Sequence, residues 1–475
     1  MPYRWLRSML LALGLLPVAA SAFAQSDSLA TSSSGRPQSQ GSIPGDVPSG
    51  PLSLSLDEAV KRGLRYNLGT IESQQSLRQA HGAIIVERSP LLPNLNTYLR
   101  EVDQQIDLAS FGFKFNAPPS LGFSIPSIVG PFNYFDLRAG LTQKLADIQA
   151  LRTYQSSRES FRAADFSVQD TRELVVYVVT SGYLEVIAAS SRVDSAKVQV
   201  ESAQAIYQQA FDRFNSGLSA RIDMTRSQVE LQTQQQRLTS EQASYAKQKI
   251  ALARLLGLSA GQEFTLTDAL PYAPLENLTL EQAIALASQN RSDLKAAEAQ
   301  VHAAEFSRKA AVAERFPTLD FAADYGVIGT NPANSHGTFS VAGELRFPIW
   351  AGGHARGDIE EADASLQQRR AEYEDLRARV EADVRTAFLD LTAAAEQVRV
   401  AQSRRALAQD ELQQARDRFA SGVADTVEVV QAQEVVSSAE QDYIASLNAH
   451  NLAKASVARA SGQAEKIMRD LLRSQ

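Results

Sequence analysis

The side chains best suited to chemistry in this sequence are a few histidines and one serine–lysine pair. The histidines are His81, His302, His336, His354 and His450. No two of them have the spacing of metal ligands on one helix, such as His-Glu-x-x-His. Ser244 and Lys247 match the Ser-x-x-Lys pattern, but the other motifs of an acyl-transfer site are missing. We therefore expect surface or core roles for the histidines and an ordinary helical position for the pair.

Two other chemical features are weak or missing. Gly352 and Gly353 could begin a phosphate loop, yet neither Gly-x-Gly-x-x-Gly nor a following Lys-Ser/Thr is present, so a turn is expected. The chain has no cysteine, which removes disulfides, thiolate metal sites and thiol nucleophiles. The sequence therefore predicts a protein that is not an enzyme, with no catalytic residue, no cofactor and no metal site.

The N-terminus has the features of an export signal. Arg4 and Arg7 precede an apolar run, and Ala22-Phe23-Ala24 follows as a small-x-small cleavage pattern, so cleavage is expected before Gln25. Removing two positive charges takes the formal net charge from -7 to -9. An acidic exported chain is a poor candidate for binding nucleic acid. Residues 25–51, rich in Ser, Gly, Pro and Gln, are expected to form a flexible leader.

A duplicated motif indicates that the chain repeats one unit. "RFNSGLSARID" begins at Arg213, and "RFASGVADTVE" begins at Arg418, 205 residues later. In each copy Ser-Gly supplies a residue able to adopt a left-handed helix cap. Each copy is therefore expected to be the tip of a helical hairpin, and each ends on a carboxylate, Asp223 or Glu428.

The elements that position these tips are long helices. Few prolines or glycines interrupt residues 147–215 and 351–420, and each stretch is expected to be one helix of roughly 100 Å at about 1.5 Å per residue. Return helices are expected over 220–257 and 425–461. Shorter helical pairs are expected at 54–67 with 70–89, and at 278–290 with 291–316. Residues at heptad spacing, all of them apolar or aromatic except Ser190, form a seam in each copy: Val179, Tyr183, Val186, Ser190 and Val193, then Val384, Phe388, Leu391, Ala395 and Val398.

Alternating residues between the helices predict four strands in two hairpins. The clearest runs are 135–141, 319–325 and 339–347, with a weaker one at 94–101. The first hairpin has a long expected tip, from Val102 to about Val129. Its region is also richer in aromatic residues than the 7% of the whole chain, which suits the aromatic girdles of an outer-membrane barrel.

The order of these motifs resembles the TolC-like outer-membrane efflux proteins. The shared pieces are "LSLDEAV" and "LTLEQAI" before the short helices, "SPLLPNL" and "ERFPTLD" before the strands, "LRFPIWAGG" after them, and the two Ser-Gly tips. The resemblance covers the chain from Leu54 to about Gly462. One departure is "LTQKLADIQA", from Leu141 to Ala150, which lacks the Phe-Pro and Gly-Gly of the second copy and leaves the geometry of that crossing open.

The resemblance implies a mainly α fold with a small β part: a long antiparallel coiled-coil helical barrel, plus four strands per chain in a shared trimeric 12-stranded transmembrane β-barrel. Four strands cannot close a barrel, because small barrels need about eight. The implied partners are two further copies in a homotrimer, outer-membrane lipid, a periplasmic membrane-fusion (adaptor) protein and an inner-membrane pump of RND, ABC or MFS type. The implied function is a passive exit duct of a tripartite efflux or type I secretion system, located in the outer membrane and extending into the periplasm. Drugs, metal ions, siderophores and secreted polypeptides remain open as cargo.

These observations predict a domain organisation in six parts. They are a signal peptide (1–24), a flexible leader (25–51), a first repeat (52–257), a linker (258–277), a second repeat (278–462) and a C-terminal tail (463–475). The strand hairpins are expected at about 94–145 and 318–349, and the helical tips at about 213–221 and 418–426.

The resemblance also implies roles for residues at the tips. The expected adaptor-docking residues are Gly217, Leu218, Ser219, Gly422, Val423 and Ala424. In the family, acidic residues on the second-repeat return helix narrow the periplasmic entrance. Glu428 falls on the first such position and Gln431 on the second, with Asp223 as the first-repeat counterpart, so a weak acidic ring is expected. Two plainer alternatives remain: the glycines could be helix caps alone, and the carboxylates could only complement the helix dipole.

A second functional class also fits the long helices. A soluble periplasmic coiled-coil scaffold would use them to space other proteins. The alternating strands favour the exit duct, since a scaffold has no use for two aromatic-rich strand hairpins.

Overall fold

The computed structural model describes residues 41–45, 50, 52–112, 127–259, 261–268, 272 and 278–466. The expected signal peptide, most of the expected leader, residues 113–126 of the first strand-hairpin tip, part of the expected linker and most of the C-terminal tail lie outside these residues.

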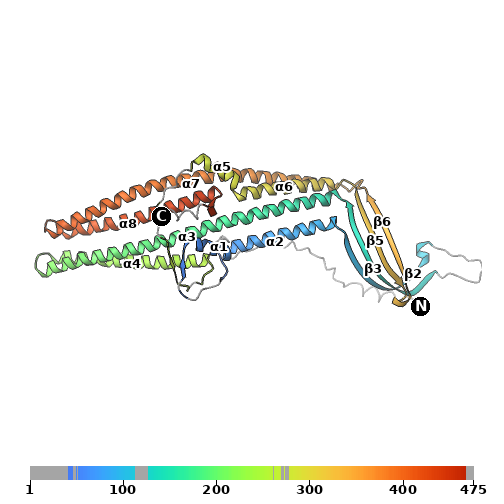
Figure 1. Ribbon diagram of the computed structural model, residues 1–475, viewed down its shortest axis with the longest axis horizontal. Coiled ribbons are helices and arrows are strands. Elements are labelled where there is room, and N and C mark those ends of the chain that lie inside the picture. The colour runs from blue at the N-terminus through green and yellow to red at the C-terminus, as the bar shows by residue number, and fades with distance from the viewer. Residues whose placement is uncertain are drawn as a thin grey trace, which may run out of the picture. The chain divides into compact units, whose positions relative to one another are not determined.

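The chain alternates helices and strands in two similar halves (Figure 1). In chain order the elements are β1 (Leu52–Leu54), α1 (Leu56–Tyr66), α2 (Leu68–Arg88), η2 (Ser89–Leu91), β2 (Asn94–Asp107), η3 (Leu108–Phe111), β3 (Ile128–Ala146), α3 (Ile148–Asn215), α4 (Arg221–Leu255), β4 (Phe264–Leu266), α5 (Leu280–Asn290), α6 (Ser292–Ala313), β5 (Thr318–Gly329), η5 (Pro332–Asn334), β6 (Ser335–Arg346), α7 (His354–Ala420) and α8 (Thr426–Ala460).

The predicted long helices are present. Helices α3 and α7 have 68 and 67 residues, and the return helices α4 and α8 have 35 each. Each long helix packs against its return helix and against a shorter helix, α3 against α4 and α2, and α7 against α8 and α6. The seams of α3 and α7 are therefore covered by two helices in succession, as their greater length requires.

The short helices begin in the same way in both halves because their sequences supply the same cap. Ser55 and Glu58 form a capping box at the start of α1, and Thr279 and Gln282 form one at the start of α5. In each box a side-chain oxygen and a side-chain carbonyl or carboxylate satisfy backbone N–H groups that the helix leaves unpaired. The "LSLDEAV" and "LTLEQAI" motifs are thus helix-start signals.

The predicted seams line the core. Val179, Tyr183 and Val186 are fully buried on α3 with residues of α1 and α4, and Val384 and Leu391 are buried on α7 with residues of α5 and α8. Burial of aliphatic side chains of this kind contributes about 1.5–3 kcal/mol each. Helix α3 also contains an 18-residue window apolar enough to cross a membrane, but 56% of that window is buried in the chain. Its apolar character thus serves helix packing.

Strands β2, β3, β5 and β6 form one antiparallel sheet in that order, which confirms the four predicted strands (Figure 1). The first two strands are longer than predicted, since β2 runs to Asp107 and β3 begins at Ile128. The expected tip from Val102 was therefore too long. The end of β2 was missed because polar residues such as Asp103 and Gln104 interrupt the alternation of apolar and polar residues. Both nevertheless pair with β3.

A second sheet was not predicted. Leu52–Leu54 of β1 pairs in parallel with Phe264–Leu266 of β4. Segments of three residues carry no detectable periodicity, so the sequence alone does not indicate them. The pairing fixes the start of the first half beside residues that follow α4.

The unusual crossing at "LTQKLADIQA" has a direct structural explanation. Strand β3 runs to Ala146, and Asp147 then accepts a hydrogen bond from the Ala150 N–H at 2.8 Å as the N-cap of α3. The second crossing uses a linker instead, in which Gly352 and Gly353 have φ angles of 63° and 93°. Aspartate capping therefore replaces the glycine turn in the first half.

Candidate functional site

Both helical hairpins turn through the same backbone geometry at their Ser-Gly sequence. Gly217 and Gly422 have φ angles of 73° and 76°, which lie in the left-handed region that favours glycine. The N–H groups of Leu218 and Val423 each donate to the carbonyl five residues earlier, at 2.8 and 2.9 Å. These bonds close a Schellman motif at the ends of α3 and α7, so both glycines cap their helices.

The residue after each glycine is an exposed apolar side chain. Leu218 is 71% exposed and Val423 is 73% exposed. Ser219 and Ala424, which follow them, are half-buried. Apolar side chains this exposed at a tight turn gain nothing from the fold of this chain, so they are free to contact another molecule.

The two carboxylates of the duplicated motif have different partners. The Asp223 carboxylate lies 3.8 Å from an Arg226 guanidinium nitrogen one turn along α4. The Glu428 carboxylate lies 3.3 Å from Nε of Arg418, across the tip on α7. Gln431 is exposed on α8. Both carboxylates sit in the first turn of a helix, where the helix dipole favours negative charge.

An arginine that the sequence did not single out joins the two tips. Arg213 Nη1 donates to the Phe419 carbonyl at 2.7 Å, and its guanidinium carbon lies 4.8 Å from the centre of the Phe419 ring. Arg213 is on α3 and Phe419 is on α7, so this contact crosses between the hairpins. Arg213 and Arg418 occupy equivalent positions at the start of the duplicated motif. The sequence therefore did not indicate that the two arginines would have different partners.

A buried polar layer joins the hairpins farther along the helices. The Ser202 hydroxyl donates to Gln433 Oε1 at 2.7 Å, and the Gln433 amide donates to Gln199. Arg416 donates to Ser202 as well. Gln433 is fully buried, and both ends of its side-chain amide are hydrogen-bonded, to Ser202 and to Gln199, as a buried polar group requires. These residues lie on α3, α7 and α8, and no local motif could have indicated their meeting.

A third contact ties α4 to α8. Arg237 donates to the Ser437 hydroxyl at 2.9 Å and to the Glu434 carboxylate at 2.6 Å. The hydrogen bond that Arg237 donates to Glu434 raises the pKa of Arg237, against the effect of burial, so the arginine stays charged. The two hairpins are therefore joined by polar contacts at three levels.

The sheet has two faces of opposite character. Asp136, Arg138, Asp324 and Thr338 share one face, and Arg138 bonds to each of the other three. The other face carries large exposed apolar side chains: Leu95, Leu99, Leu137, Tyr325, Phe339, Val341 and Leu345. Apolar residues on one face and polar residues on the other are the pattern of a strand between lipid and an aqueous lumen.

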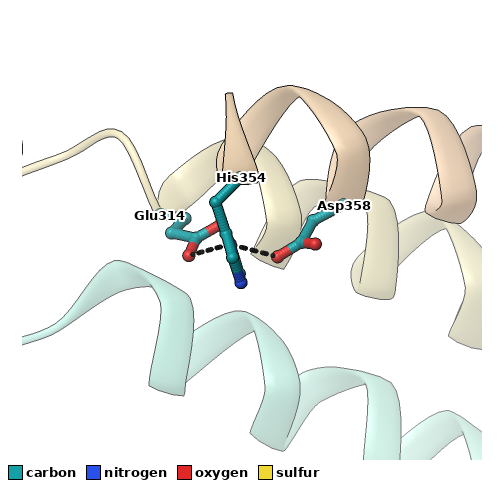
Figure 2. A group of neighbouring side chains, drawn as sticks. All are labelled: Glu314, His354 and Asp358. Atoms are coloured by element: carbon teal, nitrogen blue, oxygen red, sulfur yellow. Dashed lines mark ion pairs between the residues drawn. The ribbon is translucent and has the colours of Figure 1, made fainter. Parts of the chain in front are cut away.

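One group of side chains could hold a metal ion in the described part of the chain. Glu314, His354 and Asp358 bring a carboxylate, an imidazole and a second carboxylate together (Figure 2). Residue spacing did not predict this group, because a motif such as His-Glu-x-x-His indicates only ligands that lie close together on one helix. Glu314 lies 40 residues before His354, at the C-cap of another helix, so only the fold brings them together.

Comparison with known proteins agrees with these features. A model of the outer membrane efflux protein family matches residues 71–258 and 283–463. The pyoverdine export outer membrane protein OpmQ of Pseudomonas aeruginosa is 25% identical over 405 residues, covering 81% of this chain and 80% of that relative. Protein CyaE of Bordetella pertussis is 28% identical over 222 residues, covering 46% of this chain and 47% of CyaE.

Solved structures share the fold. The Campylobacter jejuni CmeC outer membrane channel matches with a TM-score of 0.74 at 16% identity, covering 88% of this chain and 89% of CmeC. The outer membrane protein VceC of Vibrio cholerae matches with a TM-score of 0.72 at 16% identity, covering 86% of this chain and 96% of VceC.

The family match spans most of the chain and includes both repeats. It confirms the predicted resemblance and favours the duct over the soluble periplasmic scaffold, since family and fold are those of channel proteins. The chain therefore belongs to the outer membrane efflux protein family and is an efflux exit duct of the outer membrane.

Proposed function

We propose that three copies of the chain close one 12-stranded barrel and form the passive exit of a tripartite efflux or secretion system. The observation that carries this proposal is the two-faced, four-stranded sheet with unpaired edges. Among the described strands, β2 pairs only with β3 and β6 pairs only with β5. In lipid an unpaired edge leaves backbone groups without hydrogen bonds, at several kcal/mol each, so β2 of one copy must meet β6 of the next.

Exposed apolar residues on the helices support the same assembly. Val400 and Leu407 are one heptad apart on α7, and Ile222 and Val229 are one heptad apart on α4; all four are exposed. Heptad spacing is the pattern that packs against another helix. Within the described chain these side chains find no such cover, and neighbouring copies would supply it.

The absence of cysteine makes a direct test possible. One cysteine is placed in β2 at Thr97, and a second is moved in turn along β6 from His336 to Glu344. The two strands lie at opposite edges of one sheet, so a disulfide between them must join two copies. We expect covalent trimers at positions on one face of β6. Double variants that stay monomeric at every position, while membrane-inserted, would contradict the shared barrel.

We further propose that the two tips dock onto a periplasmic adaptor protein. The glycines Gly217 and Gly422 shape the turns, and the exposed Leu218 and Val423 supply apolar contact, with Ser219 and Ala424 beside them. Replacing Leu218 and Val423 by Asp is expected to abolish transport and adaptor binding while leaving oligomer and membrane insertion intact. Val435→Asp, at another exposed apolar position on α8, is the control. Unchanged transport in the double variant would reduce the tips to helix caps.

The carboxylates near the tips are proposed to form a weak acidic ring at the periplasmic entrance. Glu428 is the main member, Asp223 is secondary, and Gln431 leaves the next position uncharged. Arg418 offsets part of the Glu428 charge, which supports a weak ring. Trivalent cations added from the periplasmic side should block single-channel conductance, and Glu428→Ala should relieve the block. If the block persists in this variant, Glu428 only complements the dipole of α8, an interaction that stabilises the helix by about 1 kcal/mol or less.

The energy for transport is proposed to come from an inner-membrane pump of RND, ABC or MFS type, because the proposed duct is passive and supplies no energy itself. Two similar relatives carry pyoverdine export in their names, which supports small-molecule cargo without assigning one. Co-purification of the pump with the intact assembly identifies its class. Recovery of the duct without any adaptor or pump after cross-linking in cells would count against the tripartite arrangement.

The domain organisation is proposed as the sequence predicts it. Residues 1–24 are removed as a signal peptide, 25–51 form the leader, and the two repeats span 52–257 and 278–462. N-terminal sequencing of the protein from outer membranes should begin at Gln25. A mature chain that begins at Met1 would refute the signal peptide and leave the repeats untouched.

A further inference from the structure

Three side chains meet where the second strand hairpin joins its helices (Figure 2). Glu314 is the C-cap of α6, His354 is the first residue of α7, and Asp358 lies one turn farther along α7. The imidazole lies between the carboxylates. Its Nδ1 is 3.2 Å from Oε1 of Glu314 and 3.1 Å from Oδ2 of Asp358.

An imidazole alone does not satisfy this arrangement. Nδ1 carries at most one proton, so it can donate one good hydrogen bond, yet two carboxylate oxygens face it. The second oxygen of Glu314, Oε2, is buried and has no hydrogen-bond partner among the described residues. Two carboxylates that converge with so few donors leave room for a positive charge between them.

A metal ion would satisfy all three groups at once. Ligand atoms bound to zinc in a tetrahedral site, with bonds of about 2.0–2.2 Å, lie about 3.3–3.6 Å apart. The observed separations of 3.1 and 3.2 Å from Nδ1 are within a few tenths of an ångström of this spacing. The three ligand atoms all lie within 4.8 Å of one another.

The surroundings also permit an ion to enter. The His354 side chain is 66% exposed, so an ion reaches Nδ1 from solvent and keeps an open position for water. The negative end of α6 and the positive end of α7 meet here and offset each other. The two carboxylates then set the sign of the local field.

We propose that Glu314, His354 and Asp358 bind one divalent transition-metal ion of the zinc class. One imidazole with two carboxylates suits zinc and its neighbours, whereas Mg²⁺ and Ca²⁺ prefer oxygen ligands alone. The ion joins the end of α6 to the start of α7 and so closes the base of the second strand hairpin.

The first repeat offers a comparison within the chain. At the positions that correspond through the Glu-Arg-x-Pro sequence and the 205-residue offset, it has Glu87, Gln149 and Thr153. Only the glutamate is retained, so the first repeat has no such ligand set. One ion per chain is therefore expected.

Equilibrium dialysis of the untagged, full-length protein in detergent against micromolar zinc tests this site. The wild-type chain should hold about one zinc per copy after treatment with EDTA and reloading. His354→Ala and Glu314→Gln should each weaken binding at least about tenfold, the loss that even the outer partners of metal ligands cause.

A matched histidine serves as the control. His302 lies 3.5 Å from a single carboxylate, that of Glu305, and its side chain is 52% exposed. His302→Ala should leave zinc binding unchanged. Failure of the wild-type chain to hold zinc would overturn the site and leave an ion pair of His354 with its carboxylates. Equal loss in the His302 and His354 variants would also overturn it, because general surface binding would then account for the metal.

Discussion

The two repeats of this chain share a backbone plan but differ in the polar residues that hold it. At the junction between α1 and α2 the first repeat uses Asn67, whose side chain accepts a hydrogen bond from the Gly69 N–H at 2.9 Å. At the same junction between α5 and α6 the second repeat uses Arg291, which is buried. Arg291 donates to Asp293 at 2.6 Å and to Asp383 at 3.1 Å.

The tips show the same contrast. Their arginines occupy equivalent positions, yet Arg213 bonds across to Phe419 in the other hairpin, whereas Arg418 pairs with Glu428 in its own. Backbone geometry is thus set by residues that recur, such as Ser-Gly and the capping boxes. The placement of charges differs between the repeats, and we expect it to make the two halves respond differently to mutation and to pH.

The largest difference is expected at the helix junctions. Arg291→Asn installs the residue type of the first repeat. It should lower the local free energy of unfolding at this junction by about 3 kcal/mol, because the largely buried carboxylate of Asp293 loses its cation. Asn67→Ala should cost about 1 kcal/mol, the usual value of a lost helix cap. Hydrogen exchange of the assembled protein around each junction measures both. Equal losses at the two junctions would contradict the comparison.

Acid should weaken the second junction more than the first. Burial alone would raise the pKa of Asp293, but the hydrogen bond and charge of Arg291 outweigh it, and the pKa is lowered. A lowered folded-state pKa adds stability above the unfolded value of about 3.9, and that stability is lost as the pH falls below it. Protection from exchange at residues 290–295, corrected for the intrinsic rate at each pH, should therefore fall below about pH 4. Protection at residues 66–70 should stay constant. Asp293→Asn should remove this pH dependence. If the pH dependence survives in the variant, a titrating group other than Asp293 causes it.

The tip arginines should differ by a smaller amount. Arg213→Ala removes a hydrogen bond from a charged group and should cost about 1.5 kcal/mol, seen as faster exchange at both tips. Arg418→Ala breaks an exposed ion pair and should cost about 0.5 kcal/mol, confined to the second tip. The result that would reverse this view is a larger effect of Arg418 than of Arg213.

The tip glycines should show no difference between the repeats. A Cβ added at Gly217 meets nothing within 4 Å, and one added at Gly422 meets only Arg213 Nη2 at 3.9 Å. Alanine at either position therefore costs only the left-handed backbone, about 1 kcal/mol. Thermal melts of the two single variants should shift equally, and a clearly larger shift for one would reveal a contact that the shared turn does not explain.

Sequence reasoning recovered the elements because their signals are local. The ends of α3, α4 and α8 fall within about two residues of prediction, since Ser-Gly caps and long proline-free stretches mark them. Helix α7 begins at His354 rather than 351, because the left-handed Gly352 and Gly353 delay it. The three-residue strands β1 and β4 were missed because so short a segment has no periodicity.

Contacts between distant segments could not be predicted in the same way. Arg213 with Phe419, Gln199 with Gln433, and Glu314 with His354 each join residues on different helices. Their meeting depends on how helices pack, which one sequence does not state. The tip residues were placed correctly as turns, while their partners became visible only in the structure.

The proposed trimer rests on the unpaired strand edges, which in lipid require closure by three copies. Native mass spectrometry of the protein extracted in mild detergent from outer membranes tests it most directly. One species of three mature chains is expected, with no folded monomer as detergent is diluted. A stable, folded monomer that retains its strands would contradict it.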